Sequence, residues 1–390
     1  MWPKPMASRF LRKNMGSNNF VADLPPDYSD LEPPVKQSTD RGTLKIFVSS
    51  WNVGGIRPPE DIDMEDWLNI HENPADIYVF GFQEIVPLNA SNVLARENSK
   101  ASVKWNRILR AALEKPRTRT QMRQDFRRVI SKQMVGIFIT VWVRSDLYGH
   151  IKHPSVSCVG CGLMGRFGNK GSVSVRFLLH ETSFCFVCSH LASGGREGDE
   201  RHRNSDAEDI LLRSSFPPVP GPLRNLPTKI LDHDRVIWFG DLNYRIHLPD
   251  ATTRSLVDQR NWSLLLQRDQ LKAELKEGRV FQGWREGDIN FPPTYKYYLN
   301  SEIYYGGDVE DARNKSKRFR APAWCDRIIW YGEGLKQSQY NRGESRLSDH
   351  RPVKAVFSAE VEQYRASSGL KRFFSGNDGC FRSSTRGTER

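Results

Sequence analysis

The sequence predicts an α/β (α+β) fold in which a two-sheet, largely antiparallel β-sandwich is flanked by helices. The first observation is a series of short runs of strand length that are rich in Val, Ile, Phe and Trp. These runs occupy residues 43–55, 75–84, 135–144, 171–179, 183–191, 234–243, 325–332 and 351–361. The second is that neighbouring runs, such as 171–179 and 183–191, are separated by short turns, which favours antiparallel pairing.

Two helix-like stretches lie between these runs, at residues 91–115 and 254–278. The second stretch ends on Gly278, and glycine is a typical residue just beyond the end of a helix. Because a helix must bury its apolar face against another element, we expect these helices to lie outside the sandwich.

Composition predicts the domain organisation. A chain of 390 residues with 38% hydrophobic content can bury one large core. Residues 1–42 hold Pro, Asp, Ser and Asn with little apolar periodicity, which predicts a flexible leader. Residues 362–390 are rich in Ser, Gly, Arg and Phe, which predicts a disordered basic tail. The folded domain is therefore expected over residues 43–361.

The chain is basic, with 58 Lys and Arg against 46 Asp and Glu and a net charge of +12. This balance favours polyanionic partners without choosing among them, and a basic run over residues 104–132 is attributed to a solvated helix face. The sequence has neither a long apolar span nor an apolar signal region, so a cytoplasmic protein is expected. Peripheral contact at the cytoplasmic membrane face is a further possibility, offered by basic and aromatic residues at 371–374.

Two cysteine pairs have CxxC spacing, Cys158 with Cys161 and Cys185 with Cys188, and this spacing is compatible with zinc. The second pair, however, lies in a run of strand character, where residues three apart point to opposite faces. Buried, reduced thiols are therefore favoured, and zinc remains the alternative.

Polar side chains stand where several predicted strands end. Asn52 closes the first run and Glu84 the second, while His190, Asp241 and Asn243 follow two later runs. If these strands are neighbours, their ends converge in one cleft, and loops at strand ends commonly carry catalytic groups.

Carboxylates in this set suit a hard cation such as Mg²⁺, because Glu84, Asp241 and Asp349 offer oxygen ligands. Other phosphate chemistries lack their required elements. A cysteine-based site needs HC followed by five residues and Arg, whereas Cys161 and Arg166 are separated by only four residues and lack the His. A P-loop is missing, and GDLNYR lacks the downstream histidines of a metallophosphatase.

Eight motifs together carry a resemblance to a known family. They are SSWNVGG (49–55), FQE (82–84), GNKGSV (168–173), SHL (189–191), WFGDLNYRI (238–246), PTYKY (293–297), APAWCDRIIW (321–330) and SDHRPV (348–353). The set resembles the inositol polyphosphate 5-phosphatases of the endonuclease/exonuclease/phosphatase superfamily, over about residues 43–360, and QEIVPLNASNVL is similar to the plant type I enzymes. The resemblance implies a four-layer, DNase I-like fold and Mg²⁺-dependent removal of a 5-phosphate.

The resemblance also implies roles for the residues at the strand ends. It makes Glu84 the principal Mg²⁺ ligand, with Asn52 and Asp349 beside the metal. It makes Asp241 the group that positions and deprotonates the attacking water, which Asn243 orients. No covalent enzyme intermediate is required.

A second group of implied roles concerns the phosphates of the substrate. His350, paired with Asp326, would stabilise the transition state with its positive charge, and His190 would contact the scissile phosphate. The family contacts to the neighbouring 4-phosphate are implied for Tyr295, Lys296 and Arg320. Assistance from Arg318 and a place at the cleft rim for Lys170 complete the implied substrate-binding set.

Two alternatives remain beside this interpretation, a nuclease of the same superfamily and a non-catalytic phosphoinositide-binding protein. PTYKY and RAPAWCDR disfavour the nuclease, so no nucleic-acid partner is expected, and an intact catalytic set disfavours the non-catalytic protein. The substrate class stays open between soluble inositol polyphosphates, such as the 1,4,5-trisphosphate and the 1,3,4,5-tetrakisphosphate, and the lipid phosphatidylinositol 4,5-bisphosphate. In either case the reaction would attenuate phosphoinositide signalling.

Overall fold

The computed structural model describes residues 39–68, 74–94, 99–115, 125–162, 165–218, 226–306 and 320–364. One sheet has the strand order β11-β12-β1-β2-β4-β3. Its strands are β1 (Thr39–Asn52), β2 (Ile77–Gln83), β3 (Phe126–Met134), β4 (Ile137–Arg144), β11 (Leu335–Arg342) and β12 (Val353–Tyr364). The second sheet has the order β5-β6-β7-β8-β10-β9. Its strands are β5 (Ile151–Gly160), β6 (Gly171–Leu179), β7 (Thr182–His190), β8 (Arg235–Asp241), β9 (Arg285–Glu286) and β10 (Asp326–Tyr331).

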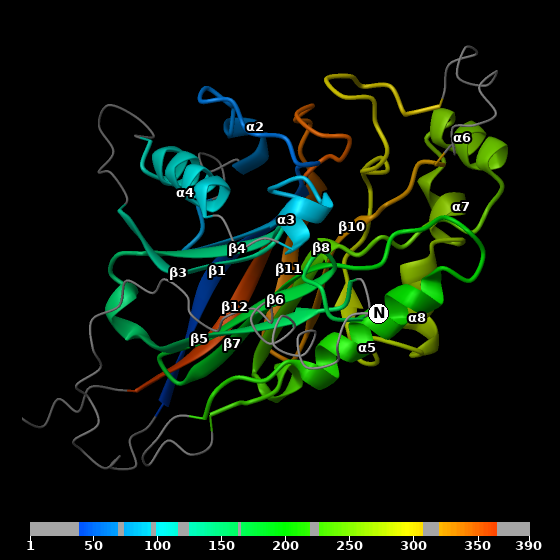
Figure 1. The fold of residues 1–390 in the computed structure, drawn as a ribbon. Helices are drawn as coiled ribbons and strands as arrows, with labels where there is room; N and C mark the ends of the chain where they lie inside the picture. The colour runs from blue at the N-terminus through cyan, green and yellow to red at the C-terminus, as the bar shows by residue number, and fades with distance from the viewer. Residues whose placement is uncertain are drawn as a thin grey trace, which may run out of the picture.

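The two sheets pack face to face, and helices cover their outer faces, which gives four layers (Figure 1). The α-helices are α2 (Glu65–Leu68), α3 (Ala90–Leu94), α4 (Lys100–Leu113), α5 (Glu200–Arg213), α6 (Asp250–Asp258), α7 (Trp262–Leu266) and α8 (Gln270–Glu277). One hydrophobic core lies between the sheets. A second lies under α2 and α4 and includes Trp67 and Trp105, and a third lies under α5 and α8 and includes Ile210 and Leu271. The predicted helix-flanked sandwich is confirmed.

Pairing within the sheets is antiparallel except between β1 and β2 and between β7 and β8, which run parallel. Every residue of β2 and of β7 is buried, because one face meets the other sheet and the other face meets helices. This two-sided burial explains why their sequences are continuous apolar runs instead of alternating ones. All eight predicted strands are present, whereas β3, β5, β9 and β11 were not predicted.

The helical predictions need correction in several places. The stretch 91–115 contains two helices, α3 and α4, and the stretch 254–278 contains three, α6 to α8. The end at Gly278 is confirmed, since this residue has a left-handed φ of 63° directly after α8. Helices α2 and α5 were not predicted. The basic run 104–132 is not one helix face, because α4 ends at Leu113 and strand β3 begins at Phe126.

The cysteine pair of β7 cannot share one ion. Cys185 belongs to the core under α5 and α8, whereas Cys188 belongs to the core between the sheets. Burial raises the pKa of the Cys188 thiol to about 12 and raises the pKa of Cys185 further, so both are neutral, apolar thiols. The preference for buried thiols over zinc at this pair is therefore confirmed.

The sheet extends slightly beyond the predicted domain 43–361, because Thr39 at the start of β1 pairs with Tyr364 at the end of β12. Most of the predicted leader and tail lies outside the described residues, so both remain predictions. Among the helices of the described ranges, none is long and apolar enough to cross a membrane.

Candidate active site

The carboxyl ends of two parallel strand pairs, one from each sheet, meet at one edge of the sandwich. Asn52 at the end of β1 is in register with Gln83 of β2, and His190 of β7 is in register with Asp241 of β8. A cleft of about 590 Å³ lies at this edge. The predicted site residues that line it are Asn52, Glu84, Lys170, His190, Asp241, Asn243, Tyr295, Lys296, Arg320, Asp349 and His350.

Among the described site residues that were predicted, Asp326 alone does not line the cleft. Asp326 is fully buried, and its carboxylate contacts the imidazole of His350, which does line the cleft. Arg318 lies outside the described residues. Residues as far apart in the sequence as Asn52 and His350 are thus brought into a single cleft. Convergence was predicted for the polar residues at strand ends, whereas the later residues were implied by the family resemblance.

Sheet pairing alone places three of these groups side by side. Asp241 is in register with His190 on one neighbouring strand and with Asp326 on the other. Directly paired residues have Cβ atoms about 4.5–5.5 Å apart, so short polar side chains can meet. The Nε2 of His190 lies 3.2 Å from Oδ2 of Asp241.

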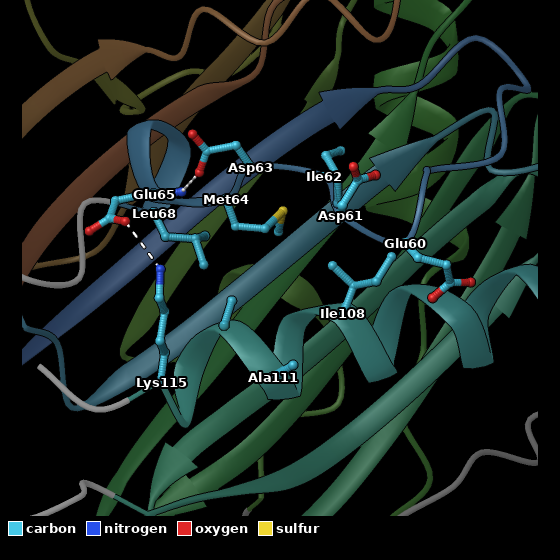
Figure 2. Close-up of a pocket in the computed structure, with 11 residues that line it drawn as sticks. Glu60, Asp61, Ile62, Asp63, Met64, Glu65, Leu68, Ile108, Ala111 and Lys115 are labelled. Carbon is cyan, nitrogen blue, oxygen red and sulfur yellow. Dashed lines mark hydrogen bonds and ion pairs between the residues drawn. The ribbon is translucent and has the colours of Figure 1, made fainter.

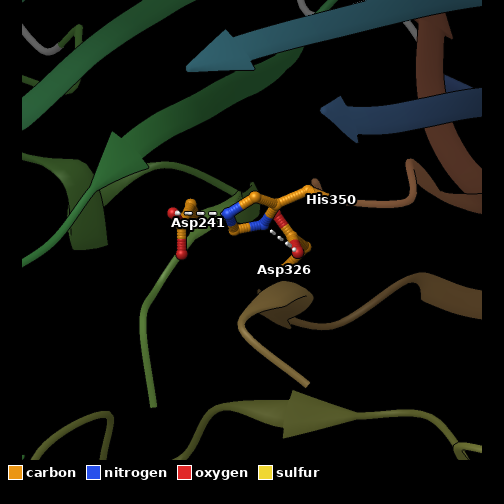
Figure 3. Close-up of side chains that lie close together, drawn as sticks. All are labelled: Asp241, Asp326 and His350. Carbon is orange, nitrogen blue, oxygen red and sulfur yellow. Dashed lines mark hydrogen bonds and ion pairs between the residues drawn. The ribbon is translucent and has the colours of Figure 1, made fainter. Parts of the chain in front are cut away.

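His350 joins this row from the loop before β12 (Figure 3). Its Nδ1 lies 2.9 Å from Oδ2 of Asp326, and its Nε2 faces Oδ2 of Asp241 at 4.0 Å. Burial acts to lower the pKa of His350, but the carboxylates of Asp326, Asp241 and Asp349 outweigh it and raise this pKa to about 9. The imidazole is therefore charged at neutral pH, and the predicted contact with Asp326 is present.

Asp241 carries the opposite charge. Burial acts to raise the pKa of its carboxyl, but the imidazoles of His190 and His350 outweigh burial and hold this pKa below its usual range. Asp241, Asp326 and His350 offer ligand atoms within 4.8 Å of one another. Nδ1 of His350 contacts Asp326 and its Nε2 faces Asp241, so the three side chains form one row centred on His350.

The carboxylate of Glu84 lies beside this cluster and shares the side chain of Asn52 with Asp241. The Nδ2 of Asn52 donates to Oδ2 of Asp241 at 2.9 Å and to Oε1 of Glu84 at 3.3 Å, so the two carboxylates flank one amide. Glu84 and Asn243 both have left-handed backbones, with φ of 54° and 59°. Residues other than glycine rarely adopt this conformation, and such strain concentrates at functional sites.

The predicted metal ligands fit a hard cation unequally. Glu84 offers a partly exposed carboxylate and is the best placed of the three. Asn52 presents its amide nitrogen to Glu84, because its oxygen accepts from the backbone of Gly54 at 3.0 Å. Asp349 is engaged by Lys296, whose Nζ lies 2.5 Å from Oδ2. The sequence prediction assigned Lys296 and Asp349 to separate partners, whereas the structure pairs them with each other.

Lys170 differs from its predicted place at the rim, because its Nζ contacts Nε2 of the buried His190 inside the cleft. Burial lowers the pKa of Lys170 to about 8, although Asp241 and Glu84 act against this shift. Burial and the ammonium group of Lys170 together lower the pKa of His190, although Asp241 and Glu84 act against this shift.

The predicted 4-phosphate residues form one cluster that adjoins the hydrolytic centre, since the ring centroids of Tyr295 and His350 lie 4.4 Å apart. Nη1 of Arg320 donates to the hydroxyl of Tyr295 at 2.7 Å. The ammonium of Lys296 lies 5.3 Å from the centroid of the Tyr295 ring and 5.5 Å from that of Tyr305. Two cations are thus held on aromatic side chains within the same cleft.

Two functional residues were missed. Arg245 is 8% exposed, donates to Oδ1 of Asn243 at 2.6 Å and lies 4.5 Å from the Tyr295 ring centroid, so it connects the hydrolytic residues to the cation cluster. Thr294 donates to Oδ2 of Asp326 at 2.6 Å. Both lie inside the motifs WFGDLNYRI and PTYKY, and their position beside assigned residues was the available signal.

A separate groove of about 380 Å³ lies between α4 and the segment 60–68 (Figure 2). Carboxylates at Glu60, Asp61, Asp63 and Glu65 line it, and it contains none of the predicted site residues. This concentration of negative charge repels phosphate, so the cleft at the strand ends is the candidate active site.

Comparisons with known proteins agree with this geometry. Residues 49–356 match the model of Endonuclease/Exonuclease/phosphatase family 2. The chain is 55% identical over 401 residues to type IV inositol polyphosphate 5-phosphatase 9 of Arabidopsis thaliana, covering 96% of this chain and 95% of that protein. It is 43% identical over 421 residues to type I inositol polyphosphate 5-phosphatase 8 of Arabidopsis thaliana, covering 93% of this chain and 86% of that protein.

A solved structure gives the same result. The inositol polyphosphate 5-phosphatase domain of spsynaptojanin, in complex with inositol (1,4)-bisphosphate and calcium ion, superposes with a TM-score of 0.70 at 32% identity. The match covers 84% of this chain and 87% of that domain.

Proposed function

Because the chain belongs to the inositol polyphosphate 5-phosphatases, we propose that it hydrolyses the 5-phosphate of inositol 1,4,5-trisphosphate, inositol 1,3,4,5-tetrakisphosphate or phosphatidylinositol 4,5-bisphosphate with Mg²⁺. The family and its DNase I-like fold are as predicted, although the two relatives named carry different type numbers. The observation that carries the substrate proposal is one cleft holding both the Asp241–His350 centre and the Lys296–Arg320 cluster.

The proposed chemistry depends on two opposite charges at the hydrolytic centre. The imidazolium of His350 would stabilise negative charge that develops on the transferring phosphoryl group. Asp241 would hold the attacking water, with Asn243 as its neighbour. Since the pKa of Asp241 is low, this carboxylate is a weak base, and orienting the water is its first task. A weak base is sufficient if the transition state is loose, because a loose transition state needs little deprotonation of the attacking water.

The proposed cation would be held by Glu84 with help from Asp349 and Asn52. Glu84 fits Mg²⁺ because its partly exposed carboxylate offers hard oxygen ligands, and the carboxylate of Asp349 lines the same cleft. When bound, such an ion would act as a Lewis acid toward a phosphoryl oxygen. The calcium ion in complex with the spsynaptojanin domain supports a divalent cation.

The proposed 4-phosphate contacts are Tyr295, Lys296 and Arg320, with Arg318 as an assisting residue. Lys296 is bound to Asp349 in the structure. A substrate phosphate would compete for this ammonium and release Asp349 toward the cation proposed beside it. Binding of the 4-phosphate and completion of the cation site would therefore favour each other.

The cellular place is part of the same proposal. We place the chain in the cytoplasm, with peripheral contact at the cytoplasmic membrane face when the substrate is a lipid. The basic and aromatic residues at 371–374 support such contact by their chemistry. They lie outside the described residues, so only their sequence supports it.

One set of assays tests the proposed function. The purified chain is incubated with Mg²⁺ and either inositol 1,4,5-trisphosphate or phosphatidylinositol 4,5-bisphosphate in vesicles, with single-stranded DNA as the nuclease control. We expect phosphate release from at least one inositol substrate and no DNA cleavage. DNA cleavage without phosphate release would favour the nuclease alternative, and binding without any turnover would favour the non-catalytic one.

A further inference from the structure

A second cleft, about 580 Å³ in volume, lies between α4 and the edge strand β3. Four arginines line it, Arg107 and Arg110 from α4 and Arg127 and Arg128 from β3. The aromatic side chains of Trp142 and Tyr148 also line it, and its volume lies within the range of small-molecule sites. Figure 1 shows α4 above β3 and β4, where this cleft is found.

Local structure brings the four guanidinium groups together from two elements. Arg107 and Arg110 are three residues apart in α4 and so share one face of the helix. On β3 the register with β4 shifts between Arg128 and Ile130, which marks a β-bulge. Bulges re-aim side chains, and here two successive residues, Arg127 and Arg128, both line the cleft.

Aromatic rings hold the strand arginines in place. The guanidinium carbon of Arg127 lies 5.3 Å from the Tyr148 ring centroid, and that of Arg128 lies 5.9 Å from the Trp142 ring centroid. A cation over an aromatic face keeps its charge and its donors while its freedom is reduced. The planar guanidinium fork is also the side chain best suited to bidentate contacts with phosphate.

The described lining residues of this cleft carry more positive than negative charge. Arg107 pairs with Glu60, and Arg110 pairs with Glu114 at 2.8 Å. Asp125 is the one acidic residue among the described lining residues. The other acidic residues of the segment 60–65 line the separate groove beside α4 that Figure 2 shows. Like charges facing one another across a cleft repel, and a bound polyanion would relieve this repulsion.

Surface arginines have an ordinary explanation, because charged residues on an edge strand prevent pairing with another chain. That explanation accounts for β3 alone. It accounts neither for a facing pair of arginines on α4 nor for the aromatic support on β4 and at Tyr148.

The cleft is distinct from the candidate active site. Phe138 of β4 pairs with Phe82, two residues before Glu84, whereas Trp142 lies four residues further along β4. At about 3.4 Å per residue this places the two about 14 Å apart along the strand. We propose that the cleft between α4 and β3 is a second anion site, which binds the clustered phosphates of a soluble inositol polyphosphate or of a phosphoinositide headgroup.

Binding of inositol hexakisphosphate, measured by calorimetry on the full chain, tests the proposal with a soluble probe. We expect two binding events on the unmodified chain. The double variant Arg110→Ala/Arg127→Ala should lose one event, with the affinity lowered at least about tenfold for each guanidinium contact removed. Both side chains are exposed, so the fold should persist, and the milder Arg127→Gln serves if the double variant melts early.

Two controls separate this inference from the proposed function. The variant Arg268→Ala/Lys336→Ala removes the same charge from exposed positions elsewhere and should keep both events. Lys296→Ala should weaken the other event, at the active site, and leave the cleft event intact. Turnover of soluble inositol 1,4,5-trisphosphate should be unchanged in Arg110→Ala/Arg127→Ala.

A second arm distinguishes the two sources of phosphate. Vesicles of phosphatidylcholine with phosphatidylinositol 4,5-bisphosphate are sedimented with each variant, and vesicles of phosphatidylcholine alone serve as the blank. If Arg110→Ala/Arg127→Ala loses binding to inositol hexakisphosphate alone, a soluble ligand is supported. If it loses binding to the vesicles alone, a lipid headgroup is supported. Loss in both arms supports the site for either source. If Arg110→Ala/Arg127→Ala behaves like Arg268→Ala/Lys336→Ala in both arms, the proposal is overturned.

Discussion

Nδ1 of His350 lies 2.9 Å from Oδ2 of Asp326, and the same oxygen accepts a hydrogen bond from Thr294 at 2.6 Å. This contact joins the first residue of β10 to the loop before β12. It fixes the ring so that Nε2 faces Asp241, and it keeps the imidazole charged. The proposed catalysis depends on this charge, so its removal is the first prediction.

Asp326→Asn should move the alkaline limit of turnover to lower pH. The pKa of His350 is raised to about 9, so its charge is present below that pH and is lost as pH rises through it. Stability has the same pH dependence. Because the pKa of His350 is higher in the folded state than its unfolded value near 6.5, protonation of His350 stabilises the native state fully below pH 6.5, and this stabilisation is lost as pH rises toward 9. The pH dependence of kcat in both proteins is the measurement.

Lys170 is the control for that profile, since its pKa is lowered to about 8 and it also titrates on the alkaline side. Lys170→Arg removes the titration of Lys170 and should leave unchanged the fall in turnover at alkaline pH that is attributed to His350. An alkaline limb that stays at the same pH in Asp326→Asn would show that the charge on His350 does not control turnover.

Asp241→Asn should abolish turnover while substrate binding and the fold persist. The substitution removes the charge that holds the water but keeps the size of the side chain, and loss of such a group commonly costs about 10²–10⁴-fold. Single-turnover rates, with melting temperature and equilibrium binding as controls, measure the effect. A folded variant with a near-normal rate would remove Asp241 from the mechanism.

Lys296→Ala should lower kcat/KM for inositol 1,4,5-trisphosphate by about one to two decades, because a charge-assisted phosphate contact contributes about 1.5–3 kcal/mol. The same change should have little effect on an analogue lacking the 4-phosphate, whose partner group is already absent. Steady-state kinetics on both substrates make the comparison. Equal losses would mean that Lys296 acts through stability or general electrostatics.

Arg245→Met should lower kcat, because it removes the donor to Asn243 and the cation beside the Tyr295 ring together. We expect about a tenfold loss or more, in line with one charge-assisted hydrogen bond. Arg245→Lys keeps the charge but not the planar fork, so it should recover stability more than kcat. If kcat falls only in proportion to the folded fraction in both variants, Arg245 has a structural role alone.

The strands that were predicted and those that were missed differ in one physical respect. β3 and β11 are the edges of one sheet, and β5 and β9 are the edges of the other. The inner strands are covered by side chains on both faces, so their sequences are long apolar runs. An edge strand such as Leu335–Arg342 alternates exposed polar residues with few buried ones, and this pattern resembles a loop.

The active site also has features that the sequence could predict and features that it could not. Some members of the cleft could be predicted because polar residues at strand ends converge once the parallel pairs form, and the others were implied by the family motifs. The contacts within the cleft could not. Lys296 binds Asp349, and Asn52 turns its amide nitrogen toward Glu84, because rotamers depend on neighbours from both sheets. Arg245 was missed for the same reason, since its role exists only where Asn243 and Tyr295 meet.

The position of the phosphate that is removed tests the central claim most directly. The purified chain is incubated with Mg²⁺ and inositol 1,4,5-trisphosphate, and the bisphosphate product is identified by ion-exchange chromatography against the three standards. The proposed function predicts inositol 1,4-bisphosphate, with its formation lost in Asp241→Asn. Formation of inositol 4,5-bisphosphate or inositol 1,5-bisphosphate by the same sample would contradict it.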